Sequence, residues 1–425
     1  MALSSRTGWK VLLAGAALSV LAMPGPSNAQ QPAPGAAPAS LPAPTAASVM
    51  ADRPQSEAAQ KLAPVAPPPI AKAADQIPLS KFKVPEGFKL EIYASGMVNA
   101  RSMARGDKGT LFVGTRLLDK IYAVTDKGGK REVKPLYSGL FRPNGLAFKN
   151  GTLYIAELNK ISKVEKIEDN LDNPPERVVI YDDLPSDEPH GWKYLAIGPD
   201  NKLYFNVGAP CNICQPSDRH AQLRRIGLDG KNPEVIARGT RQVVGLDFHP
   251  VLKQLYFSEN QRDWLSEDLP NDKLNRVTKI GKEDFGFPRC HQGNVPDPEF
   301  GWGRGCEGVT KPLALLGAHT APLGVRFYTG NMFPKEYQNV LFVARHGSWN
   351  KTKKQGGDIV AVTLNENGTV KSWKPFITGF LQRDNNYIGR PVDIMQMPDG
   401  ALLISDDWNG AVYRLSYSKS QISAR

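Results

Sequence analysis

The sequence predicts an all-β fold, a six-bladed β-propeller built from four-stranded antiparallel blades. Three observations lead to this prediction. A unit of an apolar strand, a Gly/Asp turn and a second strand recurs six times along the 425-residue chain. No helical periodicity of any length interrupts these units. The strand at 89–94 has no unit before it, so it would complete the last blade, close the ring and leave only short, protected sheet edges.

Each unit supplies an innermost strand and its partner across a turn. In chain order the six pairs are 102–104 with 110–114, 145–148 with 152–156, 193–198 with 203–208, 244–248 with 254–258, 324–328 with 339–344, and 392–397 with 401–405. Third strands are expected at 120–124, 222–227, 358–363 and 411–415, and outer strands at 134–137, 177–181, 234–237 and 374–377. Four strands in each of six units fill a propeller, whereas an eight-stranded sandwich could not use them all.

The N-terminal part has the pattern of an exported protein. Arg6 and Lys10 precede an apolar run at 11–23 and a small-residue cleavage site at 27–29, which predicts a signal peptide over 1–29 and a periplasmic location. A Pro/Ala-rich spacer follows at 30–78, then the propeller at 79–418 and a short tail at 419–425. No other run reaches the ~18–20 apolar residues of a membrane helix, so no stable membrane span is expected.

Cysteine content and charge narrow the class further. Four cysteines in an exported chain suggest two disulfides; of the three possible pairings, Cys211–Cys214 and Cys290–Cys306 are favoured because they are local. Gln215 follows the CxxC segment where a haem attachment site needs histidine. The net charge of +11 comes without a basic run interleaved with aromatics, so nucleic acid is not an expected partner.

Loops on one face of the ring should hold the chemistry. The loops leading into the innermost strands, and those joining second to third strands, would meet there. They carry arginines from five blades: Arg101, Arg116, Arg142, Arg241, Arg262, Arg345 and Arg390. Planar guanidinium forks suit carboxylates, so we expect an anionic ligand with more than one carboxylate. His190 stands at the entrance of the third innermost strand, where it could act as a general base or simply cap a surface turn.

Several segments, taken together and in order, resemble one family. They are His190-Gly191 with Leu195, Ile197-Gly198-Pro199-Asp200 and Leu203-Tyr204; then Arg241 with Gly245-Leu246 and Phe248; then Ser258-Glu259-Asn260. This order resembles the quinoprotein glucose/sorbosone dehydrogenases over roughly residues 80–416. His346-Gly347-Ser348-Trp349-Asn350 and Gly389-Arg390-Pro391-Val392-Asp393 are similar to the sorbosone dehydrogenase branch. The resemblance implies an enzyme that uses pyrroloquinoline quinone (PQQ) with Ca²⁺.

The resemblance also implies roles for individual residues. His190 matches the general base, and Arg241 matches the arginine that stabilises charge on the quinone oxygen. Gln242, Asn260, Thr320, Arg345, His346 and Arg390 match positions that contact the cofactor. Asn260, Gln261 and Arg262 match the loop whose carbonyl oxygens bind calcium, and Asp272 matches a nearby acidic residue.

Two features depart from the family pattern. Gly208-Ala209-Pro210-Cys211 stands where glucose-oxidising relatives carry an acid that can orient the histidine. Either Asp187 or Glu188 substitutes for that acid, or His190 works without a carboxylate partner. Gln261-Arg262 also replaces a Gly-Pro pair in the calcium loop.

The expected function is oxidation of a sugar or sugar aldehyde. Electrons would leave to a separate acceptor, a membrane quinone or cytochrome c, because no haem domain is attached. The alternatives are a calcium-dependent propeller lactonase and a non-catalytic propeller that binds a partner. Gly303-Arg304-Gly305-Cys306-Glu307-Gly308 matches GxGxxG but follows no strand and opens no helix, so it is rejected as a nicotinamide site. Asp406-Asp407 is interpreted as a turn with one exposed acid rather than a metal site.

Overall fold

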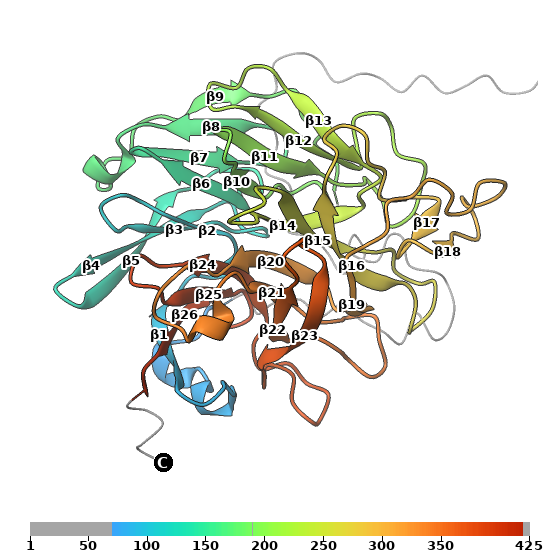
Figure 1. Cartoon of the computed structure of the whole chain (residues 1–425). Coiled ribbons are helices and arrows are strands. Elements are labelled where there is room, and N and C mark those ends of the chain that lie inside the picture. The colour runs from blue at the N-terminus through green and yellow to red at the C-terminus, as the bar shows by residue number, and fades with distance from the viewer. Residues whose placement is uncertain (1–69, 189, 420–425) are drawn as a thin grey trace, which may run out of the picture. The chain divides into compact units, whose positions relative to one another are not determined.

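The described part of the chain is a β-propeller. The computed structural model describes residues 70–188 and 190–419, so the predicted signal peptide and most of the predicted spacer lie outside the described residues. Within these ranges, no helix is long and apolar enough to cross a membrane. The ring consists of six four-stranded antiparallel sheets, which confirms the predicted architecture (Figure 1).

The six blades follow one another along the chain. Blade 1 contains β2 (Met103–Arg105), β3 (Leu111–Val113), β4 (Ile121–Lys127) and β5 (Lys130–Tyr137), and blade 2 contains β6 (Gly145–Lys149), β7 (Thr152–Ala156), β8 (Ile161–Val164) and β9 (Val178–Tyr181). Blade 3 contains β10 (Leu195–Ile197), β11 (Lys202–Val207), β12 (Gln222–Gly227) and β13 (Glu234–Arg238), and blade 4 contains β14 (Gln242–Phe248), β15 (Leu255–Asn260), β16 (Asn271–Val277) and β19 (Ala314–Ala318). Blade 5 contains β20 (Pro322–Phe327), β21 (Leu341–Arg345), β22 (Asp358–Leu364) and β23 (Val370–Ile377), and blade 6 contains β24 (Pro391–Gln396), β25 (Leu402–Asp406), β26 (Ala411–Tyr417) and β1 (Phe88–Ser95).

Apolar side chains fill the spaces between neighbouring blades. Ala104 and Phe112 of blade 1, for example, share one buried cluster with Leu146, Leu153 and Ile155 of blade 2. The inner strands are covered on both faces, so they are almost continuously apolar instead of alternating. This packing holds the ring rigid and fixes where each loop begins.

The ring closes where the first strand joins the last blade. Strand β1 pairs antiparallel with β26, from Phe88 opposite Tyr417 to Ser95 opposite Ala411. In Figure 1 the blue β1 lies beside the red β26. The ring of Phe88 packs edge-on against Phe333 and Phe376, with centroid separations of 4.8 and 5.1 Å.

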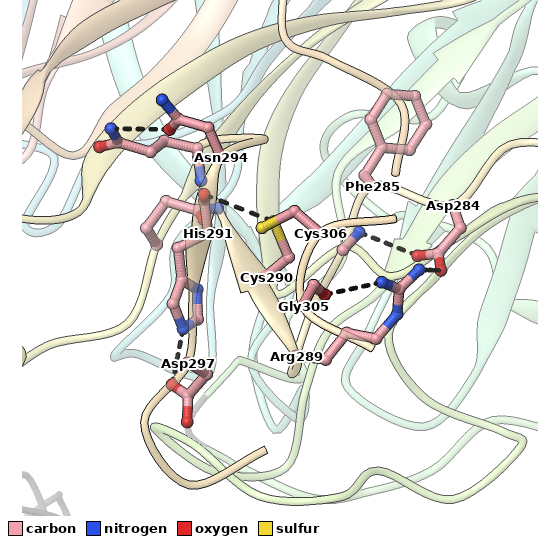
Figure 2. The surroundings of a disulfide bond; sticks show 12 residues. Asp284, Phe285, Arg289, Cys290, His291, Asn294, Asp297, Gly305 and Cys306 are labelled. Carbon is pink, nitrogen blue, oxygen red and sulfur yellow. Dashed lines mark hydrogen bonds and ion pairs between the residues drawn. A yellow bond between two sulfur atoms is a disulfide. The ribbon is translucent and has the colours of Figure 1, made fainter. Parts of the chain in front are cut away.

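An insert interrupts blade 4 between β16 and β19. It contains the short hairpin of β17 (Cys290–His291) and β18 (Val295–Pro296) and the Cys290–Cys306 disulfide. Figure 2 shows Arg289 beside this disulfide, between the Asp284 carboxylate and the Gly305 carbonyl. The second disulfide joins Cys211 to Cys214, so both predicted pairings are confirmed. The Gly303–Gly308 stretch lies in the insert as turns, with no helix after it.

Blade closure predicts a measurable loss of stability. Phe88→Ala removes an aromatic ring that is only 7% exposed, and should lower the free energy of unfolding by about 3–5 kcal/mol. Chemical denaturation measures this, with Val251→Ala as the control, because Val251 is 68% exposed and its change should stay within about 0.5 kcal/mol. Equal effects of the two substitutions would contradict the packing of β1 described above.

Candidate active site

His190 lies just before β10 with its ring fixed by the backbone. Its Nδ1 is 3.0 Å from the carbonyl oxygen of Ala209. A carbonyl only accepts, so Nδ1 carries the proton and Nε2 keeps its lone pair. Burial and the nearby Arg241 cation lower the pKa of His190 well below its ordinary value, so the ring is neutral at pH 7.

Neither neighbouring acid orients His190. The Asp187 carboxylate binds Nε2 of His220 at 3.0 Å, and Glu188 binds Nε of Arg142 at 2.7 Å. The sequence left two options open: Asp187 or Glu188 orients His190, or His190 has no carboxylate partner. The structure has the second. A backbone carbonyl supplies the orienting contact instead.

Gln242 and Trp192 lie beside this histidine. The Gln242 amide, oriented by its partners, donates to the His190 carbonyl at 2.9 Å and accepts from Nε1 of Trp192 at 3.3 Å. The Arg116 guanidinium stacks on Trp192, 3.8 Å from the ring centroid. Among the described residues nothing forms an ion pair or a side-chain hydrogen bond with this guanidinium. Burial, and then Arg101, lower the pKa of Arg116 to about 9, so it remains a cation at neutral pH.

Arg241 is buried and held from both sides. Its Nε donates to the Asn212 carbonyl at 2.8 Å, and its Nη2 donates to Asn212 Oδ1 at 2.8 Å and to Asp263 Oδ2 at 3.1 Å. Its backbone N–H donates to Oε1 of Glu259 at 3.0 Å. Burial lowers its pKa from the ordinary value, partly offset by Asp263.

Glu259 is the fully buried acid behind this arrangement. Oε1 also accepts from Nε2 of Gln261 at 3.1 Å, while Oε2 accepts from Asn275 at 2.7 Å and pairs with Lys273 at 3.1 Å. A buried carboxylate needs several such partners to offset its lost hydration. In blade 4, the Glu259 carboxylate therefore fixes both the backbone of Arg241 and the loop at Gln261.

The predicted calcium loop is anchored by Asp272. The Gln261 N–H donates to Oδ1 of Asp272 at 2.8 Å, and the Ala321 N–H donates to Oδ2 at 2.8 Å. Burial raises the pKa of Asp272 to about 6. The Asn260 amide donates to the Pro322 carbonyl at 2.8 Å. The loop thus joins blades 4 and 5.

Three other predicted site residues mainly make contacts that stabilise the fold: Arg262, Thr320 and Arg345. The Arg262 guanidinium turns to the insert and binds Asp297 at 2.6 Å. Thr320 donates to the Leu316 carbonyl at 3.0 Å. Arg345 pairs with Asp358, directly opposite it on β22, at 2.7 Å. The expectation that the loop arginines gather around one anionic ligand is therefore not met by Arg262 and Arg345, whose guanidiniums pair with Asp297 and Asp358.

His346 and Arg390 belong to a second charged group. Nε2 of His346 lies 2.8 Å from Oδ1 of Asp407, whose Oδ2 binds Arg101 at 2.7 Å. Arg390 donates through Nε to the His346 carbonyl at 3.1 Å and also to the Gly347 carbonyl. Burial, then Arg390, lower the pKa of His346 to about 4 despite Asp407.

The interpretation of Asp406-Asp407 needs correction. The turn is present, but both acids are buried, at 0% and 2% exposure. Asp406 accepts backbone N–H groups from Arg390, Trp408 and Asn409, whereas Asp407 bridges His346 and Arg101. Sequence reasoning also missed Asn212 and Asp263, whose only signal was their position in loops of the same face.

Comparisons with known proteins agree with this architecture. A family model described as "Glucose / Sorbosone dehydrogenase" matches residues 156–414. The chain belongs to the glucose/sorbosone dehydrogenase family. An uncharacterized protein of Borreliella burgdorferi is 34% identical over 365 residues, spanning 82% of this chain and 94% of that protein.

Two proteins with a named activity or class are also similar to this chain. The pyrroloquinoline quinone-dependent pyranose dehydrogenase of Coprinopsis cinerea is 31% identical over 123 residues, 25% of this chain and 16% of that protein. The solved PQQ domain of the Coprinopsis enzyme, in its holo form, superposes with a TM-score of 0.66 at 19% identity, covering 79% of this chain and 97% of that one. A calcium structure of a Trichoderma reesei carbohydrate-active enzyme of family AA12 gives a TM-score of 0.70 at 20% identity, covering 82% of this chain and 100% of that one. At these identities the two structures show the shared fold.

The site residues fit an anionic ring and a hard cation. Arg116 offers a cation without an acidic partner among the described residues, and both Arg116 and Arg241 lie near enough to His190 to lower its pKa, after burial. Oδ1 of Asn350 is buried and finds no hydrogen-bond partner in the described part of the chain, while its Nδ2 donates to Asp263 at 2.6 Å. Free oxygen donors beside a carboxylate suit Ca²⁺.

His346 should make stability depend on pH. The unfolded chain binds a proton near pH 6.5, whereas folded His346 binds it only near pH 4, so unfolding takes up a proton between these values. The free energy of unfolding should therefore fall as pH drops from about 6.5 to 4, by at most roughly 3 kcal/mol. Urea unfolding of wild type and His346→Gln at several pH values measures the difference. Parallel pH curves for the two proteins would show that His346 is not held neutral.

Proposed function

We propose that this protein is a PQQ-dependent dehydrogenase that oxidises a sugar or sugar aldehyde, with His190 as the general base. The observation that carries the proposal is a neutral histidine whose Nδ1 is tied to Ala209 and whose ring lies near buried Arg241. Membership of the glucose/sorbosone dehydrogenase family supports the reaction class. The relation to a PQQ-dependent pyranose dehydrogenase supports the cofactor.

His190 takes the substrate hydroxyl proton at Nε2. Its low pKa keeps it in the base form throughout the neutral range, and the Ala209 carbonyl stabilises the ring as it gains a proton. PQQ, when bound, supplies the quinone that accepts the hydride from the substrate carbon. Arg241 provides the fixed positive charge that stabilises negative charge developing next to His190.

The remaining charged groups would hold the cofactor. Arg116, Arg390 and Gln242 face an anionic planar ring in this proposal, with Thr320, His346 and Asn260 supporting the same loops. The carbonyls of residues 260–262, with Asp263 and Asp272 nearby, would hold Ca²⁺, since these are hard oxygen donors. Arg345 is left in a structural role by its pairing with Asp358.

The cellular setting of the proposal rests on the sequence. The pattern at 1–29 is proposed as a signal peptide, 30–78 as a spacer and 419–425 as a tail, giving a periplasmic enzyme with its propeller at 79–418. The two disulfides support an oxidising compartment. A sorbosone-like substrate and a separate electron acceptor, membrane quinone or cytochrome c, complete the proposal.

Replacing His190 tests the proposal directly. Apoprotein supplied with PQQ and Ca²⁺ should reduce a dye with aldoses, sorbosone or related alcohols, and His190→Ala should lower kcat by about 100-fold or more. The control is His249→Asn, at the far end of β14, where Nδ1 only accepts the N–H groups of Val251 and Leu252.

Three outcomes can be separated. Loss of activity in His190→Ala, with activity retained in His249→Asn, supports His190 as the general base. Unchanged turnover in His190→Ala rejects it as the base. A wild-type protein that binds PQQ or sugar without turnover would be a non-catalytic propeller.

A further inference from the structure

We infer that the loop closed by the Cys211–Cys214 disulfide is the positioning element of this site, and that Asn212 acts as a positioning residue for Arg241. The catalytic part of this inference rests on the proposed function, whereas the positioning part concerns contacts of the chain itself. The loop follows β11 directly, where the family pattern would place an orienting acid.

At the start of this loop, the backbone packs tightly against His190. A Cβ on Gly208 would lie 2.1 Å from the His190 carbonyl oxygen and 2.8 Å from its Cβ, so only glycine fits. The next residue, Ala209, donates its N–H to the Arg241 carbonyl at 2.8 Å and accepts the Nδ1 proton of His190. One residue therefore connects the base to the backbone of the arginine.

Asn212 then fixes the side chain of that arginine. Its carbonyl and its Oδ1 both accept from the Arg241 guanidinium at 2.8 Å. The same Oδ1 accepts the Asp263 N–H at 2.8 Å, and Nδ2 donates to the Asp263 carbonyl at 3.2 Å. Asn212 is 5% exposed, so water competes little for these bonds. A single side chain in blade 3 thereby sets the direction of Arg241 and anchors the blade 4 loop.

The disulfide explains how so short a segment holds this geometry. Asn212 lies between the two bonded cysteines, which are three positions apart. A cross-link over so few residues restricts the conformations that the loop can adopt. Asn212 can then present its carbonyl and its amide oxygen to the same guanidinium.

The first test needs no cofactor. Burial lowers the pKa of His190 and the Arg241 cation lowers it further, so Asn212→Ala, which removes the Oδ1 acceptor and loosens the guanidinium, should let that pKa rise. NMR titration of the ¹⁵N-labelled imidazoles in apoprotein measures the His190 pKa. The resonance that is missing in His190→Gln identifies the His190 signal. Cys211→Ala/Cys214→Ala should shift the His190 titration in the same direction.

The matched control removes the other disulfide. Cys290→Ala/Cys306→Ala changes two cysteines in the insert, where Cys290 Sγ lies 3.7 Å from the His291 carbonyl oxygen (Figure 2). It should leave the His190 titration unchanged. In this control protein, reduction of Cys211–Cys214 should shift the His190 signal and reoxidation should restore it. This redox test replaces the Cys211→Ala/Cys214→Ala variant if that variant does not fold.

Kinetics of the reconstituted enzyme give the second readout. Asn212→Ala should lower kcat by about 100-fold with a smaller change in KM, because a misplaced Arg241 acts on the chemical step. A His190 titration and a kcat both like wild type, with only a lower Tm, would overturn the inference and leave the loop a stabilising staple. A shifted titration in a protein with no PQQ-dependent turnover would reject the proposed function while upholding the positioning role.

Discussion

The ion pair and hydrogen bonds of the buried Glu259 carboxylate are the interactions on which the candidate active site depends. Burial of a charge is costly unless ion pairs and hydrogen bonds replace its lost hydration, and Glu259 receives Lys273, Asn275, Gln261 and the Arg241 N–H. Lys273 and Asn275 lie on β16, whereas Arg241 directly precedes β14 and Gln261 directly follows β15. Packing of the blade therefore fixes the backbone of the arginine that the proposed reaction needs.

The charges around the candidate active site are only partly balanced. Asp407 serves both Arg101 and His346, and Asp263 serves Arg241 and Asn350. Arg116 stacks on Trp192 without an acidic partner in the described ranges. Such a site is preorganised for an anion, since its cations are already desolvated and fixed before the ligand arrives. Burial and the cations themselves hold the pKa of His190 low, while the Ala209 carbonyl, rather than a carboxylate, fixes the direction of its ring.

The sequence predicted the parts of the molecule that local patterns determine. Strand pairs followed from apolar runs flanking Gly and Asp turns, and both disulfides join cysteines close in sequence. The third strands β8 and β16 were not predicted, and neither was the outer strand β19 of blade 4, which the insert separates from β16.

Side-chain partners depended on contacts that no local pattern encodes. Arg101 meets Asp407 across 306 positions, a pairing that exists only when the ring is closed. Arg345 faces Asp358 through the register of β21 with β22, and a shift of one residue would have turned it to the other face of the blade.

We propose that fixed, only partly balanced cations on this face bind an acidic quinone. This proposal is tested most directly by equilibrium titration of the apoprotein with PQQ and CaCl₂ at several salt concentrations, followed by absorbance. We expect saturable uptake of one PQQ per chain, weakened by salt, and a spectral change when an oxidisable sugar is added. No saturable uptake, or uptake that is indifferent to salt and sugar, would contradict it.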